Sequence, residues 1–214
     1  YQPKFHAPAG PVLGFEALLR WQHPKQGLLT PDLFLPLAEK TGLIVPIGNW
    51  VINEACRQLR EWHLQGHQSW SIAVNLSTLQ FEQPSLVKTV LDCLALHQVP
   101  PEMLILEVTE TTAMSNPDES VRVLTELTDA GVKASIDDFG TGYSSLLYLK
   151  RLPACELKID RAFVKELSGE SEDATIVSAI VALAKTLNLK VVAEGVETEA
   201  QQAFLTELGC NTLQ

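Results

Sequence analysis

Acidic and amide side chains recur at the ends of the apolar segments of this sequence. Asp137 and Asp138 stand side by side after the apolar run of "KASIDDFGTGYSSL" (133–146). Other polar residues stand in or directly after further predicted strands: Glu16, Asn75, Glu107, Lys158, Glu194 and Gln214. Adjacent carboxylates repel each other, and charges are rarely buried without a partner. Because the placement repeats, it indicates one shared site rather than scattered surface charge.

Several carboxylates and a carboxamide that meet at one place need cations to neutralise them. Mg²⁺ and Mn²⁺ prefer oxygen ligands, so they suit this set of side chains. An adjacent pair such as Asp137–Asp138 can place one carboxylate between two ions and the other on the second ion, since ions in two-metal sites lie roughly 3.5–4 Å apart. Lys158 among these acids would form a salt bridge or hold an anionic oxygen.

Strands and helices alternate regularly from residue 70 onward. Apolar, β-branched segments predict strands at 70–77, 103–110, 132–138, 155–160, 189–196 and 210–214. Helical spacing and capping residues predict helices at 84–99, 116–131, 144–152, 173–188 and 198–209, with Ser144 or Ser145 as the cap of the third. Six successive strand–helix units predict a parallel sheet.

Two more strands are expected upstream, at 1–5 and 12–21, followed by helices at 31–41 and 47–65. About six residues join these two strands, too few for a helical crossover, so the sequence predicts an antiparallel hairpin. Eight strands are compatible with a closed barrel or an open doubly wound sheet. Polar residues on nearly every strand favour the barrel, whose active sites use the ends of many strands, whereas a doubly wound sheet concentrates its site at one switch point.

Composition narrows the class of protein. The 214 residues carry a net charge of −10, which disfavours a nucleic-acid polymer as partner. Four scattered cysteines are typical of a reducing compartment. No apolar run reaches the roughly 18 residues of a spanning helix. The expected location is therefore the cytoplasm, either free or as the cytoplasmic part of a membrane-anchored protein.

Six motifs in order carry a family resemblance. "EALLRW" (16–21), "NLS" (75–77), "EVTE" (107–110), "DDFGTGYSSL" (137–146), "LKIDR" (157–161) and "EGVE" (194–197), followed by Gln214, together resemble the EAL domain. That family hydrolyses the bacterial second messenger cyclic di-GMP. The resemblance implies an α/β, TIM-like (β/α)8 barrel with an antiparallel first strand. It covers residues 1–214 as one catalytic domain, which we expect to be excised from a larger multidomain protein, with its last strand and closing helix truncated.

The resemblance also implies a role for each matching residue. Glu16, Asn75, Glu107 and Asp137 look like ligands of one Mg²⁺ or Mn²⁺ ion, and Asp137 and Asp138 like ligands of a second. Lys158 resembles the catalytic lysine that orients the attacking water, with Glu194 nearby as ligand or base and Glu110 as the catalytic-site residue that anchors the loop after Asp138. The implied substrate contacts are Gln2, Leu18, Arg20 at a phosphate, Asp160 at a guanine, Glu197, and Gln214 near the catalytic water.

The place of Glu110 can be argued from strand geometry. Glu107 and Glu110 are three residues apart, so in a regular strand they face opposite ways. Glu107 would then face the ions while Glu110 meets the loop "FGTGYSS". Its carboxylate is expected to accept two or three hydrogen bonds there, from backbone N–H groups or the hydroxyls of Thr141, Ser144 and Ser145.

Two functions remain open at this point. The first is a metal-dependent phosphodiesterase that opens cyclic di-GMP to linear 5'-pGpG. The second is a cyclic di-GMP receptor, since degenerate EAL domains bind without hydrolysis. Every implied ligand position is filled, which favours the enzyme. The resemblance further implies a homodimer through the helix after the "DDFG" loop, and regulatory or GGDEF domains in the parent protein.

Overall fold

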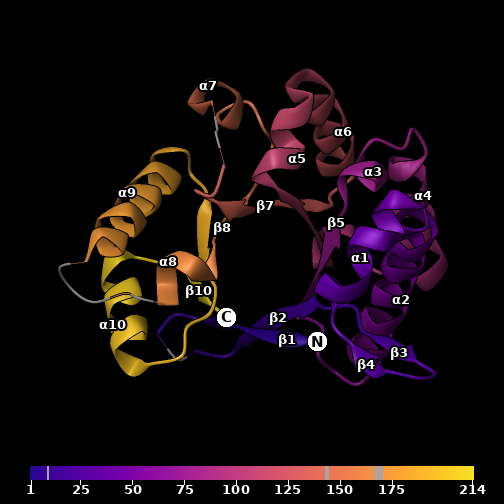
Figure 1. The fold of residues 1–214 in the computed structure, drawn as a ribbon, viewed down its shortest axis with the longest axis horizontal. Coiled ribbons are helices and arrows are strands. Elements are labelled where there is room, and N and C mark those ends of the chain that lie inside the picture. Colours follow the sequence, from indigo (N-terminus) through magenta and orange to yellow (C-terminus); the bar gives the residue numbers. More distant parts are fainter. Residues whose placement is uncertain (9, 143–144, 166, 168–170) are drawn as a thin grey trace.

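Eight strands close into a barrel in this computed structural model, which describes all residues except 9, 143–144, 166 and 168–170. Helices surround the strands on the outside (Figure 1). The strands follow the order β1 (Gln2–His6), β10 (Thr212–Leu213), β9 (Lys190–Ala193), β8 (Glu156–Ile159), β7 (Lys133–Phe139), β6 (Leu104–Thr109), β5 (Ser71–Leu76) and β2 (Val12–Ala17). The closed α/β barrel predicted from the sequence is confirmed, and the open sheet is excluded.

The first strand runs against its neighbours. β1 pairs antiparallel with β2, where Lys4 lies opposite Gly14, and antiparallel with β10, where Phe5 lies opposite Leu213. All other neighbouring barrel strands are parallel. The predicted hairpin is therefore confirmed. Its antiparallel first strand brings Gln2 to the end of the barrel where the parallel strands finish.

The strand predicted over 12–21 was too long. β2 ends at Ala17, and a separate two-stranded sheet follows, made of β3 (Trp21–His23) and β4 (Gly27–Leu29). The turn between them ends at Gly27, whose φ of +76° suits a residue without a Cβ atom. The apolar residues from Val12 to Trp21 concealed this break.

Six helices of ten or more residues lie around the barrel in the described part of the chain. They are α1 (Pro31–Lys40), α2 (Ile44–Leu64), α4 (Leu86–His97), α6 (Pro117–Asp129), α9 (Glu172–Thr186) and α10 (Glu199–Leu208). Each buries apolar side chains. Ile52, Val90 and Leu124 are fully buried, and each such side chain contributes about 1.5–3 kcal/mol on burial. None of the helices in the described part of the chain is long and apolar enough to cross a membrane.

Short helices follow several strands and were missing from the prediction. α3 (Thr78–Phe81), α5 (Glu110–Ser115) and α8 (Arg161–Lys165) begin within two residues of β5, β6 and β8, and a 3₁₀ turn (Pro101–Met103) precedes β6. Side-chain caps start two of them, because Ser77 and Thr109 each accept a backbone N–H. α7 (Leu146–Leu149) is shorter than expected. Ser145 is at its N-cap position without a side-chain hydrogen bond, and Ser144 lies outside the described residues.

Candidate active site

The polar residues singled out in the sequence gather at one end of the barrel. Glu16, Asn75, Glu107, Asp137 and Lys158 lie within β2, β5, β6, β7 and β8, while Glu194 and Gln214 directly follow β9 and β10. Asn75 pairs with Glu107 across two strands, and Gln2 pairs with Glu16. The site thus uses every strand of the barrel, as the barrel hypothesis required.

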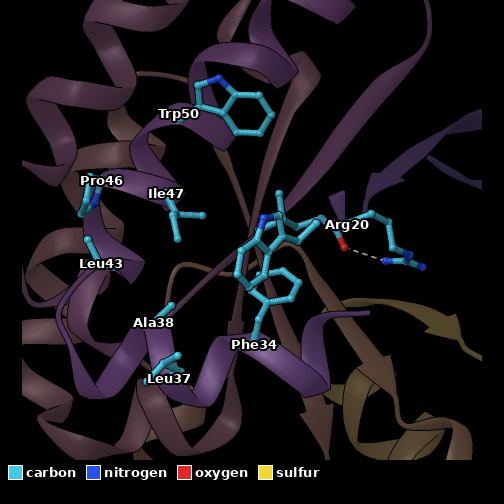
Figure 2. A pocket seen from close by; sticks show the side chains of 10 residues that line it. Arg20, Phe34, Leu37, Ala38, Leu43, Pro46, Ile47 and Trp50 are labelled. Carbon is cyan, nitrogen blue, oxygen red and sulfur yellow. Dashed lines mark hydrogen bonds between the residues drawn. The ribbon is translucent and has the colours of Figure 1, made fainter. Parts of the chain in front are cut away.

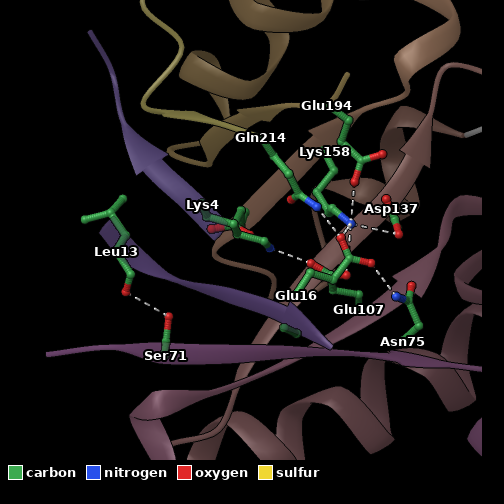
Figure 3. A network of polar contacts seen from close by, with 12 residues as sticks. Lys4, Leu13, Glu16, Ser71, Asn75, Glu107, Asp137, Lys158, Glu194 and Gln214 are labelled. Carbon is green, nitrogen blue, oxygen red and sulfur yellow. Dashed lines mark hydrogen bonds and ion pairs between the residues drawn. The ribbon is translucent and has the colours of Figure 1, made fainter. Parts of the chain in front are cut away.

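Lys158 is the centre of this cluster. Its side chain is 0% exposed, and its ammonium faces four carboxylates (Figure 3). Nζ lies 2.6 Å from Glu194, 2.9 Å from Glu107, 3.1 Å from Asp137 and 3.5 Å from Glu16. Burial lowers the pKa of Lys158, but the four carboxylates outweigh it and hold that pKa well above its usual value. Lys158 is therefore a fixed positive charge.

Two amides orient Glu16. Asn75 donates from Nδ2 to Glu16 Oε1 at 2.6 Å, and Gln214 donates from Nε2 to Glu16 Oε2 at 2.5 Å. Burial raises the pKa of Glu16, yet Lys158 and these two hydrogen bonds together lower it below its usual value. Gln214 Oε1 is buried without a hydrogen-bond partner. The two amides thus favour the ionised form of Glu16, and the unpaired Oε1 of Gln214 lies beside it.

Negative charge is in excess here. Burial, more than the attraction of Lys158, sets the pKa of Glu107 and raises it to about 7. Burial also raises the pKa of Glu194. Burial first, and then Asp137, raise the pKa of Asp138 to about 6. Raised carboxyl pKa values at Glu107, Glu194 and Asp138 indicate that further positive charge would stabilise the site.

The two adjacent aspartates lie where the pairing of β7 with β8 is interrupted by a bulge. The register of β7 against β8 shifts between Ile136 and Phe139, and Asp138 has a φ of +53°, a left-handed value that aspartate tolerates better than most residues. The backbone N–H of Asp138 donates to Asp137 Oδ1 at 2.9 Å. Asp137 contacts Lys158, whereas Asp138 makes a side-chain hydrogen bond with Asp160. Asp137 therefore belongs to the cluster around Lys158, whereas Asp138 lies beside Asp160.

Glu110 meets the glycine-rich loop, but not from a strand. β6 ends at Thr109 and Glu110 is the first residue of α5, so the argument from strand alternation was wrong. Its carboxylate is buried and accepts the backbone N–H of Gly140 at 2.9 Å. The Thr141 hydroxyl donates to the Asp138 carbonyl rather than to Glu110. The predicted contact with the loop is confirmed, but the described residues provide one hydrogen bond to Glu110 rather than the two or three expected.

The predicted substrate contacts surround the cluster. Arg20 is exposed, donates to the Leu19 carbonyl, and lines an apolar pocket of about 570 Å³ with Trp21, Phe34 and Trp50 (Figure 2). Leu18 lines another pocket, of about 380 Å³, which reaches Asn75. Asp160 follows β8 and accepts the Ala162 N–H at 2.7 Å, while Glu197 is exposed and lines a third pocket with Arg161 and Lys165. These residues lie in the loops around the mouth.

Two buried charges were missed in the sequence. Lys4 donates to Glu107 Oε1 at 2.6 Å and lies 3.7 Å from Glu156. Both side chains face the barrel interior beneath the cluster. The alternation of strand residues was the available signal, because Lys4 is two residues from Gln2, and Glu156 is two residues from Lys158.

The donors fit Mg²⁺ or Mn²⁺ in chemistry. Five carboxylates, counting Asp138, lie near two ammonium groups, those of Lys158 and Lys4, and the amides of Asn75 and Gln214 add neutral oxygen atoms. Within the described residues, no three His, Cys, Asp or Glu side chains already have the arrangement of a metal site. The carboxylates converge on Lys158 instead, so a cation must compete with its ammonium for their oxygens.

Comparison with known proteins agrees with this geometry. The family model for the EAL domain matches residues 1–214. The bifunctional diguanylate cyclase/cyclic di-GMP phosphodiesterase MucR of Pseudomonas aeruginosa is 67% identical, over 100% of this chain and 31% of that protein. The cyclic di-GMP phosphodiesterase NbdA of the same organism is 48% identical, over 100% of this chain and 27% of that protein. The chain thus spans less than a third of the length of these relatives.

Solved structures have the same barrel. The PaMucR phosphodiesterase in complex with c-di-GMP superimposes with a TM-score of 0.97 at 67% identity, covering 100% of this chain and 87% of that one. The FimX EAL domain from Pseudomonas aeruginosa bound to c-di-GMP gives a TM-score of 0.89 at 27% identity, covering 100% of this chain and 85% of that one. With its barrel, its motifs and its full-length match, this chain belongs to the EAL domain family.

Proposed function

We propose that this chain is a metal-dependent phosphodiesterase that hydrolyses cyclic di-GMP to linear 5'-pGpG. The observation that carries the proposal is the convergence of Glu16, Glu107, Asp137 and Glu194 on Lys158 at the barrel mouth. The similarity to two cyclic di-GMP phosphodiesterases and to a phosphodiesterase bound to c-di-GMP supports the choice of substrate.

The residues at the mouth would hold two Mg²⁺ or Mn²⁺ ions. Glu16, Asn75, Glu107 and Asp137 would bind the first, and Asp137 with Asp138 the second. Bound there, such ions supply Lewis acidity at the phosphoryl group and lower the pKa of a coordinated water. The bulge at Asp138 supports this division, because it separates the surroundings of the two aspartates.

The reaction adds one water across one phosphodiester bond. The water oxygen attacks phosphorus, the bond from phosphorus to the 3' oxygen breaks, and the product carries a 5'-phosphate and a 3'-hydroxyl. Lys158 orients the water, with Gln214 beside it. Glu194, whose carboxylate lies 2.6 Å from Lys158 Nζ, would serve as a further cation ligand or accept a proton from the attacking water.

Residues around the mouth would hold the substrate. Arg20 is free to meet a phosphate, since its guanidinium is exposed and contacts only a backbone carbonyl among the bonds that the structure describes. Asp160 would accept guanine N–H groups. Gln2, Leu18 and Glu197 would complete the contacts from β1 and the neighbouring loops.

Incubation of the purified chain with cyclic di-GMP tests the proposal. With Mg²⁺ or Mn²⁺ we expect linear pGpG to accumulate over many turnovers, and a chelator to stop it. Stoichiometric binding without any product would instead identify the chain as a cyclic di-GMP receptor. A chain that neither binds cyclic di-GMP nor forms product would be neither the enzyme nor the receptor.

The chain would act in the cytoplasm as part of a larger signalling protein with regulatory or GGDEF domains, in keeping with the share of MucR that it covers. A homodimer through α7 is supported by Leu146 and Leu147, which are both exposed. Sedimentation of the wild type and of a Leu146→Ser/Leu147→Ser variant tests this. Two monomeric species would contradict the dimer.

A further inference from the structure

Lys4 lies inside the barrel, beneath the acidic cluster. Side chains alternate along a strand, so Lys4 shares the inward face of β1 with Gln2, which lies opposite Glu16 at the mouth. The residue opposite Lys4 on β2 is Gly14, which has no side chain. Only 4% of Lys4 is exposed, and its side chain extends toward Glu107 (Figure 3).

The two carboxylate oxygens of Glu107 have different partners. Oε1 accepts from Lys4 Nζ at 2.6 Å, on the interior side. Oε2 accepts from Lys158 Nζ at 2.9 Å, among the other carboxylates of the mouth. Lys4 is farther from its second acidic neighbour, Glu156, at 3.7 Å, and Glu156 Oε1 has no hydrogen-bond partner. Glu107 is therefore the main partner of the Lys4 ammonium.

We propose that Lys4 is a positioning residue that holds back one oxygen of Glu107, so that this ligand offers a single oxygen to a cation and the site favours Mg²⁺ or Mn²⁺ over Ca²⁺. The inference rests on the proposed function, since it concerns the ions of that site. A charge-assisted hydrogen bond between two buried groups restrains the carboxylate strongly.

The selectivity follows from the coordination habits of the ions. Ca²⁺ takes about six to eight oxygens and readily accepts both oxygens of one carboxylate. Mg²⁺ demands six ligands in near-octahedral geometry at about 2.0–2.1 Å, which one oxygen from each carboxylate satisfies better. A Glu107 freed from Lys4 could offer both oxygens and would suit Ca²⁺. A lysine that only stabilised the fold would change the affinity for both ions alike.

Titration of the full chain with MnCl₂ or CaCl₂ alone, by calorimetry without substrate, tests the proposal. In Lys4→Met we expect the Ca²⁺ affinity relative to the Mn²⁺ affinity to rise about tenfold, the size of effect usual for a residue that orients a metal ligand. Lys4→Arg retains the charge and the donor and should keep the wild-type ratio. If Lys4→Met does not fold, Lys4→Gln should show the same rise, because its shorter amide also releases Glu107.

Two control variants separate this role from general charge effects. Lys88→Met removes an exposed lysine that pairs with Asp92 across one helical turn, and should leave the ratio unchanged. Glu156→Gln removes the other acid beside Lys4 without freeing Glu107, and should also leave it unchanged.

An unchanged ratio in Lys4→Met, or equal changes for both ions, would overturn the inference while leaving the proposed function intact. A wild-type chain that binds no Mn²⁺ would overturn both the metal dependence and this inference.

Discussion

The Glu110 carboxylate accepts the backbone N–H of Gly140 at 2.9 Å, which joins the start of α5 to the loop after β7. Gly142, two residues further along the loop, also lies close to Glu110, because a Cβ atom on Gly142 would be 3.1 Å from Glu110 Oε1. Gly140 is two residues beyond Asp138, and Glu110 is three beyond Glu107. This one bond therefore couples two of the predicted ligand-bearing segments.

Glu110→Ala should lower both the Mn²⁺ affinity and the rate, although Glu110 itself need not touch an ion. Loss of the acceptor leaves the Gly140 N–H unpaired and releases the backbone that follows Asp138. Glu110→Gln keeps an acceptor oxygen and should lose less. A Glu110→Ala variant with the wild-type rate and Mn²⁺ dependence would show that the contact has no functional role.

Asp137→Asn should abolish turnover more completely than Asp138→Asn. Asp137 lies among the carboxylates around Lys158, accepts the backbone N–H of Asp138, and is the proposed ligand of both ions. Neutralising it weakens both. Rates and Mn²⁺ titrations of the two variants are the measurement. Equal losses with equal metal affinity would count against Asp137 as the shared ligand.

Lys158→Ala should retain most of its affinity for cyclic di-GMP while kcat falls sharply, because a group that acts on the nucleophile contributes mainly in the transition state. Affinity that collapses in step with the rate, measured by calorimetry, would make Lys158 a binding residue instead.

The same variant should be less stable when no metal is present. Removing Lys158 leaves four buried or partly buried carboxylates without their shared cation, and breaking a buried ion pair from one side costs about 3–5 kcal/mol. Urea unfolding with a chelator should show this loss, and Mn²⁺ should reduce it. A Lys158→Ala chain as stable as the wild type in chelator would contradict the central role of this ammonium.

Mn²⁺ binding should weaken as the pH falls. A carboxylate must lose its proton before it can bind a cation. The pKa of Glu107 is about 7, so the proton competes effectively below that pH and hardly at all above it. Between pH 8 and pH 6 the affinity should fall about tenfold for this one proton. Calorimetry in buffers of different ionisation enthalpy should detect the released proton. An affinity independent of pH over this range would exclude Glu107 as a ligand.

The barrel and its mouth could be predicted because they depend on regular patterns. The alternation of apolar strands and amphipathic helices determined the parallel sheet, and the short link after residue 5 required the antiparallel first strand. The repeated polar residues at strand ends then identified the mouth. Asp137, Glu107 and Lys158 meet there for the same reason, because parallel strands end on one side.

The short helices, the helical position of Glu110 and the burial of Lys4 could not be predicted, because they depend on contacts that no local sequence pattern encodes. α3, α5 and α8 have four to six residues, too few for an apolar stripe, and two of them are set by capping side chains. Glu110 begins such a helix, which is why the strand argument for it was wrong. Lys4 escaped notice because a lysine near the start of the chain usually faces solvent, and only the closed barrel places it beside Glu107.

Hydrolysis in water labelled with ¹⁸O tests the central claim most directly. The purified chain is incubated with cyclic di-GMP and Mn²⁺ in H₂¹⁸O. The products are then separated, and their masses are measured by mass spectrometry. The account predicts linear pGpG with one ¹⁸O atom in the new 5'-phosphate, and no such product in the presence of a chelator. Cyclic di-GMP recovered unlabelled and intact, although bound by the protein, would contradict it.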